Sequence, residues 1–493
     1  MSDFRSPNYA HRVLSRRQFL GRAAGAALGT LLWQRQSCRA ADNRLAEEID
    51  LRSLRPKVHM RVKSVVVRIK PPYWLGWPGT SYDVEKHRKE YAARFAACAQ
   101  RVGTALEQVE APLEDDNAVN AFCEALEKER PDAVLVSIQH MGTWHWADRI
   151  ARTGVPTIIF APIGTSFTGH VIEISRRPGV HVVSSLETRG VEQALRMVRA
   201  QKQLEASRLL IVAGTDRRET VLDHTGTKVR YVPRRTLHEL FARMPTDTPE
   251  LRAITGEIMG AADRVVEPIT QDVMNAARSF CTAKRLLADE GANAISTDCL
   301  GMVGSRLVPT PPCMAASLFQ DHGVTYGCEA DLWAAMGLML VNYLFDKPGF
   351  MNDPVPETVK NRLVVAHCSC GSRLRGYSKP RAPFRLRSHS ESNLGVSMQV
   401  LWPVGQPATL LSFQGTDTIL LDSGTVRGNV DTPPAGGCRT SVELEMDRIA
   451  DCRDVRGFHQ VVFLGDHRRD VEAFCQMHGY KITNSPERPP ERV

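Results

Sequence analysis

Several familiar signatures are missing from this chain of 493 residues. No GxGxxG motif follows a predicted strand and no GxSxG motif occurs, which argues against an oxidoreductase or a hydrolase built on α/β domains. The chain has no pair of Cys-x-x-Cys motifs, so a structural zinc ribbon is not expected. We find no basic patch that would indicate nucleic acid as a partner, and no internal repeat.

The composition is that of an ordinary globular protein, with 43% hydrophobic and 24% charged residues. The formal net charge is +8, but seven of the arginines lie in the first 40 residues, so the remainder is close to balanced. The 12 cysteines are scattered, and only Cys368 and Cys370 lie close together. A large enzyme with dispersed cysteines need not be a disulfide framework, and we interpret most of these thiols as small buried hydrophobes.

The first 40 residues have the layout of a bacterial export signal. Residues 15–20 read SRRQFL, which matches the twin-arginine pattern, and small residues around Ala40 offer a cleavage site. The apolar stretch 23–33 is too short to span a bilayer, which needs ~20 apolar residues. An amphipathic basic helix of a cytosolic protein is the alternative interpretation. We expect export by the twin-arginine machinery to the periplasm or another extracytoplasmic compartment, without a stable membrane anchor.

The twin-arginine route carries folded chains, frequently with a cofactor already bound. The signal therefore directs attention to a bound metal.

Apolar strands and amphipathic helices alternate in the first two thirds of the chain. The expected strands are 63–70, 132–139, 155–162, 180–185, 208–214 and 292–298, and the expected helices are 85–102, 117–129, 189–205 and two within 248–290. Buried strands separated by helices predict parallel sheets covered on both faces.

The pattern changes after residue 346, where strand-like runs follow one another with glycine and proline turns between them. These runs are 363–370, 396–404, 408–415, 417–426, 439–446 and 460–466. They predict an antiparallel barrel or sandwich. The expected parts are a signal peptide (1–40), a linker (41–60), two α/β domains (61–200 and 201–346), a β-rich domain (347–484) and a disordered tail (485–493).

Polar residues gather at a few points of the second half. Glu329 and Asp331 stand at the beginning of an almost wholly apolar helix, where a helix-capping role is the simpler interpretation. Asp353 follows Asn352 in an Asp-Pro turn, and His367 ends a predicted strand. His459 and His389 are further candidates, although an isolated histidine is more often structural.

Carboxylates and imidazoles together form an oxygen-rich ligand set. Such a set suits Mn²⁺ or a cation of similar hardness better than a thiolate zinc site does. The residues come from separate segments, so composition alone does not establish the site.

The order and spacing of four segments resemble the L-fucose and L-arabinose isomerase family. The segments are CEADLWAAMGLML (328–340), PGFMND (348–353), VVAHC (364–368) and GFHQVVFLGD (457–466). The resemblance covers about residues 290–482 and implies two Rossmann-like α/β domains followed by a β-barrel-like C-terminal domain. It also implies a homo-oligomer and a Mn²⁺-dependent interconversion of aldose and ketose.

The resemblance assigns roles to particular residues. It implies Glu329, Asp353, His367 and His459 as metal ligands, with Glu329 and Asp353 also moving the proton through a cis-enediol. Asn352 stands where the arabinose enzymes have Glu, and Gln460 where they often have His.

Four residues are assigned to the sugar or to the neighbourhood of the ion. Asp331 is expected to orient a ligand or a sugar hydroxyl, and Asp298, at the end of a strand, to bind sugar hydroxyls. Asn352 and His389 complete the set expected at the substrate. An exported sugar-binding protein of the same fold that has lost catalysis is the alternative function.

Overall fold

The computed structural model describes residues 44–487 apart from residue 74 and residues 432–436. The predicted export signal, and all but the first residues of the predicted tail, lie outside this described part. Within it, no helix combines the length and the apolar character that a membrane crossing requires.

The first α/β unit is a five-stranded sheet in the order β2-β1-β3-β4-β5, and all of its strand pairs are parallel. Its strands are β1 (Arg61–Val67), β2 (Ala105–Gln108), β3 (Ala133–Ile138), β4 (Thr157–Ala161) and β5 (Val180–Ser184). Its helices are α2 (Val84–Val102), α3 (Asp116–Glu129), α4 (Trp144–Ala151), α5 (Thr168–Val171) and α6 (Arg189–Ala206). Every residue of β3 and β4 is buried, as expected for central strands of a parallel sheet.

The second α/β unit has the strand order β11-β10-β6-β8-β7. Its strands are β6 (Arg208–Val212), β7 (Arg218–Val221), β8 (Lys228–Val232), β10 (Ala294–Thr297) and β11 (Thr325–Gly327). Its helices are α7 (Arg235–Arg243), α8 (Pro249–Ala261), α9 (Thr270–Glu290), α10 (Cys299–Gly304), α11 (Cys313–Asp321) and α12 (Leu332–Phe345). The edge strand β7 runs antiparallel to β8, so this sheet is not wholly parallel. Every residue of β7 is exposed, and the strand therefore leaves no apolar run in the sequence.

The C-terminal part contains a closed six-stranded barrel in the order β16-β19-β12-β13-β18-β17, with β16 and β17 pairing to close it. Its strands are β12 (Phe350–Glu357), β13 (Arg362–His367), β16 (Pro407–Phe413), β17 (Thr418–Asn429), β18 (Thr440–Met446) and β19 (Gln460–Leu464). β20 (Lys481–Thr483) pairs with β17 outside the barrel circuit. A small sheet joins β14 (Phe384–Arg387) and β15 (Ser397–Val400) to β9 (Arg264–Val265) of the second unit.

The strand β12 carries two prolines, Pro354 and Pro356, although it lies within the barrel. Residues 350–352 pair with β19, whereas residues 353–357 pair only with β13. Proline has no amide proton to donate to a ladder, and it is tolerated where one edge of a strand is unpaired. The prolines thus occupy the half of β12 that has lost its second neighbour, which explains why this strand looks like a turn in the sequence.

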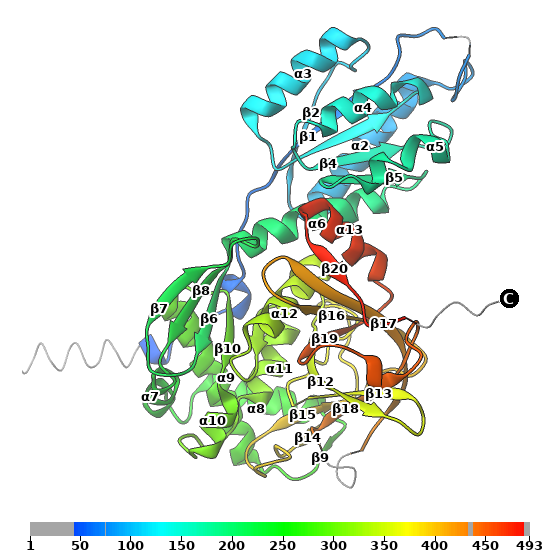
Figure 1. Ribbon diagram of the computed structural model, residues 1–493. Coiled ribbons are helices and arrows are strands. Elements are labelled where there is room, and N and C mark those ends of the chain that lie inside the picture. The colour runs from blue at the N-terminus through cyan, green and yellow to red at the C-terminus, as the bar shows by residue number, and fades with distance from the viewer. Residues whose placement is uncertain (1–43, 74, 432–436, 488–493) are drawn as a thin grey trace, which may run out of the picture.

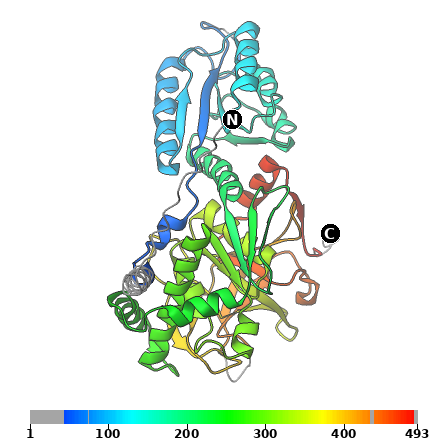
Figure 2. The same cartoon turned by 90° about the vertical axis from the view of Figure 1, so that its left-hand side faces the viewer.

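The first α/β unit forms one lobe, and the second unit with the barrel forms the other (Figures 1 and 2). Helix α6 runs between the lobes, and α13 (Arg468–His478) and β20 lie beside it. The segment predicted as a linker is attached to the second unit: Lys284 Nζ donates a hydrogen bond to the carbonyl of Ile49 (2.9 Å), and Asn293 Nδ2 donates one to that of Leu54 (2.9 Å).

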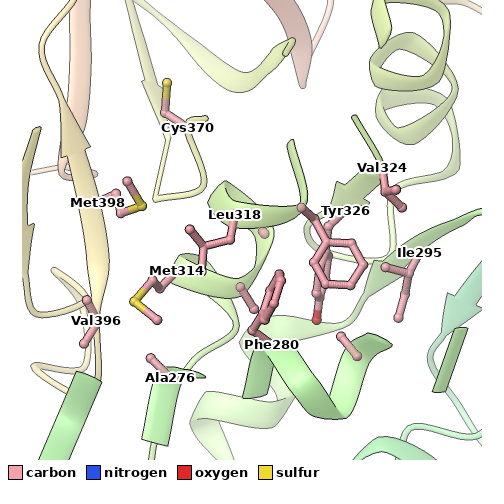
Figure 3. Close-up of a cluster of buried hydrophobic side chains, with 14 of the residues drawn as sticks. Ala276, Phe280, Ile295, Met314, Leu318, Val324, Tyr326, Cys370, Val396 and Met398 are labelled. Carbon is pink, nitrogen blue, oxygen red and sulfur yellow. The ribbon is translucent and has the colours of Figure 1, made fainter. Parts of the chain in front are cut away.

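The second unit and the C-terminal part share one hydrophobic core. In Figure 3, Met314 and Leu318 of α11 lie between Met398 of β15 on one side and Phe280 of α9 on the other. The rings of Phe280 and Phe319 meet edge to face at 5.4 Å. This packing fixes the carboxyl ends of β10 and β11 relative to the barrel.

Candidate metal centre

Glu329 lies in a strained turn between β11 and α12. Glu329 and Ala330 both adopt left-handed backbone conformations, with φ of 57° and 54°. This conformation costs an L-residue about 1–2 kcal/mol, and such outliers cluster at functional sites. The amide of Ala330 donates a hydrogen bond to the carbonyl of Thr297 (2.9 Å), which attaches the turn to the end of β10. Glu329 is thereby held at the carboxyl edge of the second sheet.

His459 comes from the segment before β19 and also has a left-handed backbone, with φ of 51°. Its Nε2 lies 3.4 Å from a carboxylate oxygen of Glu329 and 3.2 Å from one of Asp353. Its other ring nitrogen, Nδ1, lies 2.9 Å from Asp331 Oδ2. Three carboxylates from two segments thus surround one buried imidazole.

Asp331 performs two tasks at once. Its Oδ1 accepts a hydrogen bond from the amide of Ala334 (2.9 Å) and caps α12, while its Oδ2 accepts from His459 Nδ1. A carboxylate on Nδ1 keeps the proton there and leaves the Nε2 lone pair free for a metal ion. The helix-cap interpretation of Asp331 and its predicted orienting role are therefore compatible.

His367, at the end of β13, approaches from the opposite side. Its Nε2 lies 3.7 Å from Glu329, and Glu329, His367 and His459 each place one ligand atom within 4.8 Å of the others. Its Nδ1 accepts a hydrogen bond from the amide of Cys368 (2.9 Å). A neutral ring that accepts at Nδ1 carries its proton on Nε2, so His367 is better arranged to donate a hydrogen bond than to bind a cation.

Three buried atoms of this cluster form no hydrogen bond of acceptable geometry: His367 Nε2, together with His459 Nε2 and Asp353 Oδ1, which face each other as an ion pair at 3.2 Å. Buried polar atoms are nearly always satisfied by protein or by a bound group. Carboxylates with imidazole suit a divalent cation of intermediate hardness. Glu329 and His459, with Asp353 3.2 Å from the same ring nitrogen of His459, therefore offer donors that suit the predicted Mn²⁺ or a similar ion.

The carboxylates have a large effect on the proton affinity of His459. Burial alone would lower the pKa of His459, but its contacts with Asp331, Asp353 and Glu329 outweigh burial and raise the pKa to about 11. Burial would likewise raise the pKa of Asp331, yet the hydrogen bonds from His459 and the amide of Ala334 lower it. Without a metal ion, the imidazole is therefore a cation at neutral pH.

Metal binding at this centre is expected to release a proton. Because an ion must replace the proton on His459 Nε2, the apparent affinity for Mn²⁺ should rise about tenfold per pH unit between about pH 6 and 8, well below the metal-free pKa. Calorimetric titration of the metal-free protein in buffers of different ionisation enthalpy measures the proton count. His459→Gln should weaken binding and abolish the proton release, whereas His170→Gln, in the first lobe, should do neither. An affinity independent of pH would contradict this prediction.

Two residues predicted at the substrate have other partners. Asp298 caps α10 by accepting from the amide of Gly301 (2.9 Å), and it pairs with the guanidinium of Arg234. Asn352 is fully buried, and its amide group donates to the carbonyls of Phe350 (3.1 Å) and Gln460 (2.9 Å). Since neighbouring residues of a strand face opposite sides, Asn352 points away from the cluster that Asp353 faces.

His389 lies in a different group of side chains. It is buried, and it shares a cluster with Cys313 and Cys368 rather than with Glu329. Its Nδ1 lies 2.9 Å from Ser392 Oγ. The predicted contact of His389 with the sugar therefore stays a prediction that these neighbours do not support.

Sequence reasoning missed a basic hollow at the carboxyl edge of the second sheet. A cavity of about 440 Å³ lies beside the ends of β6 and β8, and it is lined by Gly214, Thr215, Pro233, Arg234, Arg235, His238 and Leu307. No motif marks these residues; only the rule that ligands bind at the carboxyl edge of such sheets could have found them.

Comparison with characterised proteins gives a distant match. The chain is 22% identical over 196 residues to the sulfoquinovose isomerase of Clostridium sp. (strain MSTE9). The matched region covers 36% of this chain and 42% of that protein, so the chain spans less than half of its relative. No protein-family model matches the chain.

Proposed function

We propose that this protein is a divalent-metal-dependent aldose–ketose isomerase of the L-fucose and L-arabinose isomerase type that acts outside the cytoplasm. The observation that carries the proposal is the convergence of Glu329, Asp353, His367 and His459 with three buried atoms among them that form no hydrogen bond of acceptable geometry. The distant similarity to a sugar isomerase agrees with it.

Each side chain has a task in this proposal. Glu329, Asp353 and His459 hold the ion, and Asp331 fixes the ring of His459. A bound divalent ion supplies Lewis-acid polarisation of the sugar carbonyl. Glu329 and Asp353 exchange a proton with the two neighbouring sugar carbons, one removing it and the other returning it. His367 donates its Nε2 proton to a sugar oxygen.

The surroundings of the cluster suit a sugar. The ring of Phe458 is 68% exposed, although it lies only 4.2 Å from the ring of His459. An exposed aromatic ring beside a polar cluster offers an apolar platform for the carbon-bound hydrogens of a sugar. The 25% exposure of the Glu329 side chain leaves this carboxylate open to a substrate.

The charge of the basic hollow bears on the kind of sugar. Arg234 is paired with Asp298, and Arg235 is a second guanidinium in the lining, whereas burial lowers the pKa of His238. An anionic group on the sugar, such as the sulfonate of sulfoquinovose, would find complementary charge at the same sheet edge. We therefore include anionic sugars beside neutral aldoses among the candidate substrates.

The alternative of a binding protein without catalysis rested on Asn352 and Gln460. In the structure, both side-chain amides donate to backbone carbonyls: Gln460 Nε2 bonds that of Arg456, and Asn352 faces away from the cluster. These two departures therefore remove no group from the centre, which favours retained catalysis.

Purified protein loaded with Mn²⁺ should convert at least one sugar of a panel to its ketose. The panel contains neutral aldoses and sulfoquinovose, and NMR in D₂O detects both the ketose and the deuterium that a proton transfer through an enediol introduces at the reacting carbon. Binding of a sugar without ketose and without exchange would refute catalysis and favour the binding protein.

We also propose, from the resemblance, that the protein is a homo-oligomer and, from the SRRQFL motif at residues 15–20, that it is exported by the twin-arginine machinery. Light scattering of the purified protein measures its mass. Replacing Arg16 and Arg17 by Lys should retain the protein in the cytoplasm.

A further inference from the structure

A second group of metal-ligand side chains lies beside the first. Cys313, Cys368 and His389 each place one ligand atom within 4.8 Å of the others, and all three are buried. They come from the beginning of α11, the end of β13 and the segment after β14. Cys438, just before β18, contacts the Cys368 thiol without belonging to this 4.8 Å group, so a fourth segment borders the cluster.

The geometry of His389 is that of an oriented ligand. Its Nδ1 is engaged by Ser392 Oγ at 2.9 Å, and its backbone amide donates to the carbonyl of Leu394 (3.0 Å). The ring also contacts the Cys368 thiol, and one ring nitrogen lies within 4.8 Å of the sulfurs of Cys313 and Cys368. A hydrogen bond at one ring nitrogen, with the other free for a cation, is the usual arrangement of a metal-bound histidine.

Other interpretations of this cluster fit less well. A reactive nucleophile needs access to its substrate, yet Cys368 is only 3% exposed. Small buried hydrophobes would account for the thiols, but not for an imidazole placed among them. Cys313 and Cys368 do not form a disulfide.

We propose that Cys313, Cys368 and His389, with Cys438 as the fourth ligand, form a structural Zn²⁺ site. Zinc prefers four ligands of this kind in a tetrahedron, and closed sites of three cysteines and one histidine are structural rather than catalytic. Cys313 is the first residue of α11, where the helix dipole favours a thiolate. Binding releases the thiol protons and needs no oxidant or reductant.

The two centres are separated by the end of one strand. His367 and Cys368 are consecutive, and their side chains serve different clusters, one rich in oxygen and one rich in sulfur. A zinc ion would tie α11 of the second unit to the barrel strands β13 and β18 directly behind His367. The site is thus independent of the proposed reaction, and it fixes the strand that carries one of the residues in that reaction.

The test uses the full-length protein and two metals. Protein purified without chelators should contain about one zinc per chain, and X-ray absorption at the zinc edge should show sulfur neighbours at about 2.3 Å. Replacement of zinc by Co²⁺ should give the near-ultraviolet charge-transfer absorption of cobalt bound to thiolate. Cys313→Ser and His389→Gln should each lose most of the zinc and weaken this absorption.

Matched variants separate this site from the first centre. Cys475→Ser, a buried thiol of α13, should keep the zinc, and Glu329→Gln should lose Mn²⁺ while keeping the cobalt–thiolate absorption. Wild-type protein that isomerises sugars but shows no sulfur neighbours around zinc would overturn the zinc site alone. A disulfide found by mass spectrometry between Cys368 and either Cys313 or Cys438 in protein isolated from its native compartment would overturn it as well. Thiolate-bound zinc in a protein without isomerase activity would leave this inference standing and refute the function.

Discussion

Glu329→Gln is expected to lower the turnover number of the isomerase by about 10³-fold or more, because it removes a carboxylate with two functions. General acid–base catalysis by one positioned group contributes about 10²–10⁴-fold, and the same oxygens are proposed to bind the ion. Glutamine keeps the size of the side chain and the left-handed turn at residues 329–330, so the fold should be retained. Kinetics with saturating Mn²⁺, together with elemental analysis, measure both losses.

The controls distinguish proton transfer from metal binding. Asp353→Asn should reduce turnover comparably, because Asp353 shares His459 with Glu329. Glu127→Gln, an exposed residue of α3, should leave turnover and metal content unchanged. Full activity in Glu329→Gln would refute the catalytic role of Glu329. An unchanged Mn²⁺ content would show that the ion binds at another site.

His367→Asn should separate a hydrogen-bond donor from a ligand. If His367 donates its Nε2 proton, the variant keeps most of its Mn²⁺ but loses turnover. Loss of Mn²⁺ from the variant would instead show that His367 is a metal ligand, as the resemblance implies.

The main architecture could be predicted from the sequence, because buried strands leave strong local signals. Continuous apolar runs such as residues 133–138 and 157–161 predict central strands of a parallel sheet. The barrel strands after residue 360 were predicted from the same signal, and the closed barrel confirms the β-rich C-terminal part. Among the strands that were missed, β7 is polar, β12 is interrupted by proline and β11 is only three residues long.

The candidate centre could be predicted only in part. The resemblance named Glu329, Asp353, His367 and His459, and the fold brings these four together from four segments. No pattern in the sequence separates His367 from His459, because the difference lies in what each Nδ1 contacts: the amide of Cys368 in one ring and the carboxylate of Asp331 in the other.

The cluster of Cys313, Cys368, His389 and Cys438 could not be predicted from the sequence. Zinc sites are recognised by close pairs of cysteines, whereas Cys313, Cys368 and Cys438 are separated by tens of residues. Only the packing of α11 against the barrel brings them together. The scattered thiols that we interpreted as small hydrophobes therefore include a group with a different chemistry.

Asp321→Ala is expected to destabilise the lobe that contains the second α/β unit and the barrel by about 3–5 kcal/mol, the usual effect of removing one partner from a buried ion pair. Asp321 is fully buried at the last residue of α11, where its negative charge opposes the helix dipole. Its carboxylate accepts from Ser372 Oγ (2.6 Å) and the amide of Arg373 (2.7 Å), and it pairs with the guanidinium of Arg381. The alanine variant would leave all three donors without this acceptor.

The same arginine supplies the control. Arg381 also pairs with Glu257 at 3.1 Å, but that carboxylate is 64% exposed. Glu257→Ala should therefore cost less than about 1 kcal/mol, as solvent-exposed pairs do. Urea unfolding at fixed metal and protein concentration compares the two variants, because bound ligand shifts apparent stability. Equal losses of unfolding free energy in both variants would contradict the prediction, because the burial of Asp321 would then add no stability. A loss confined to Asp321→Ala, accompanied by weaker zinc and Mn²⁺ binding, would show that the loop after β13 is held in place from α11.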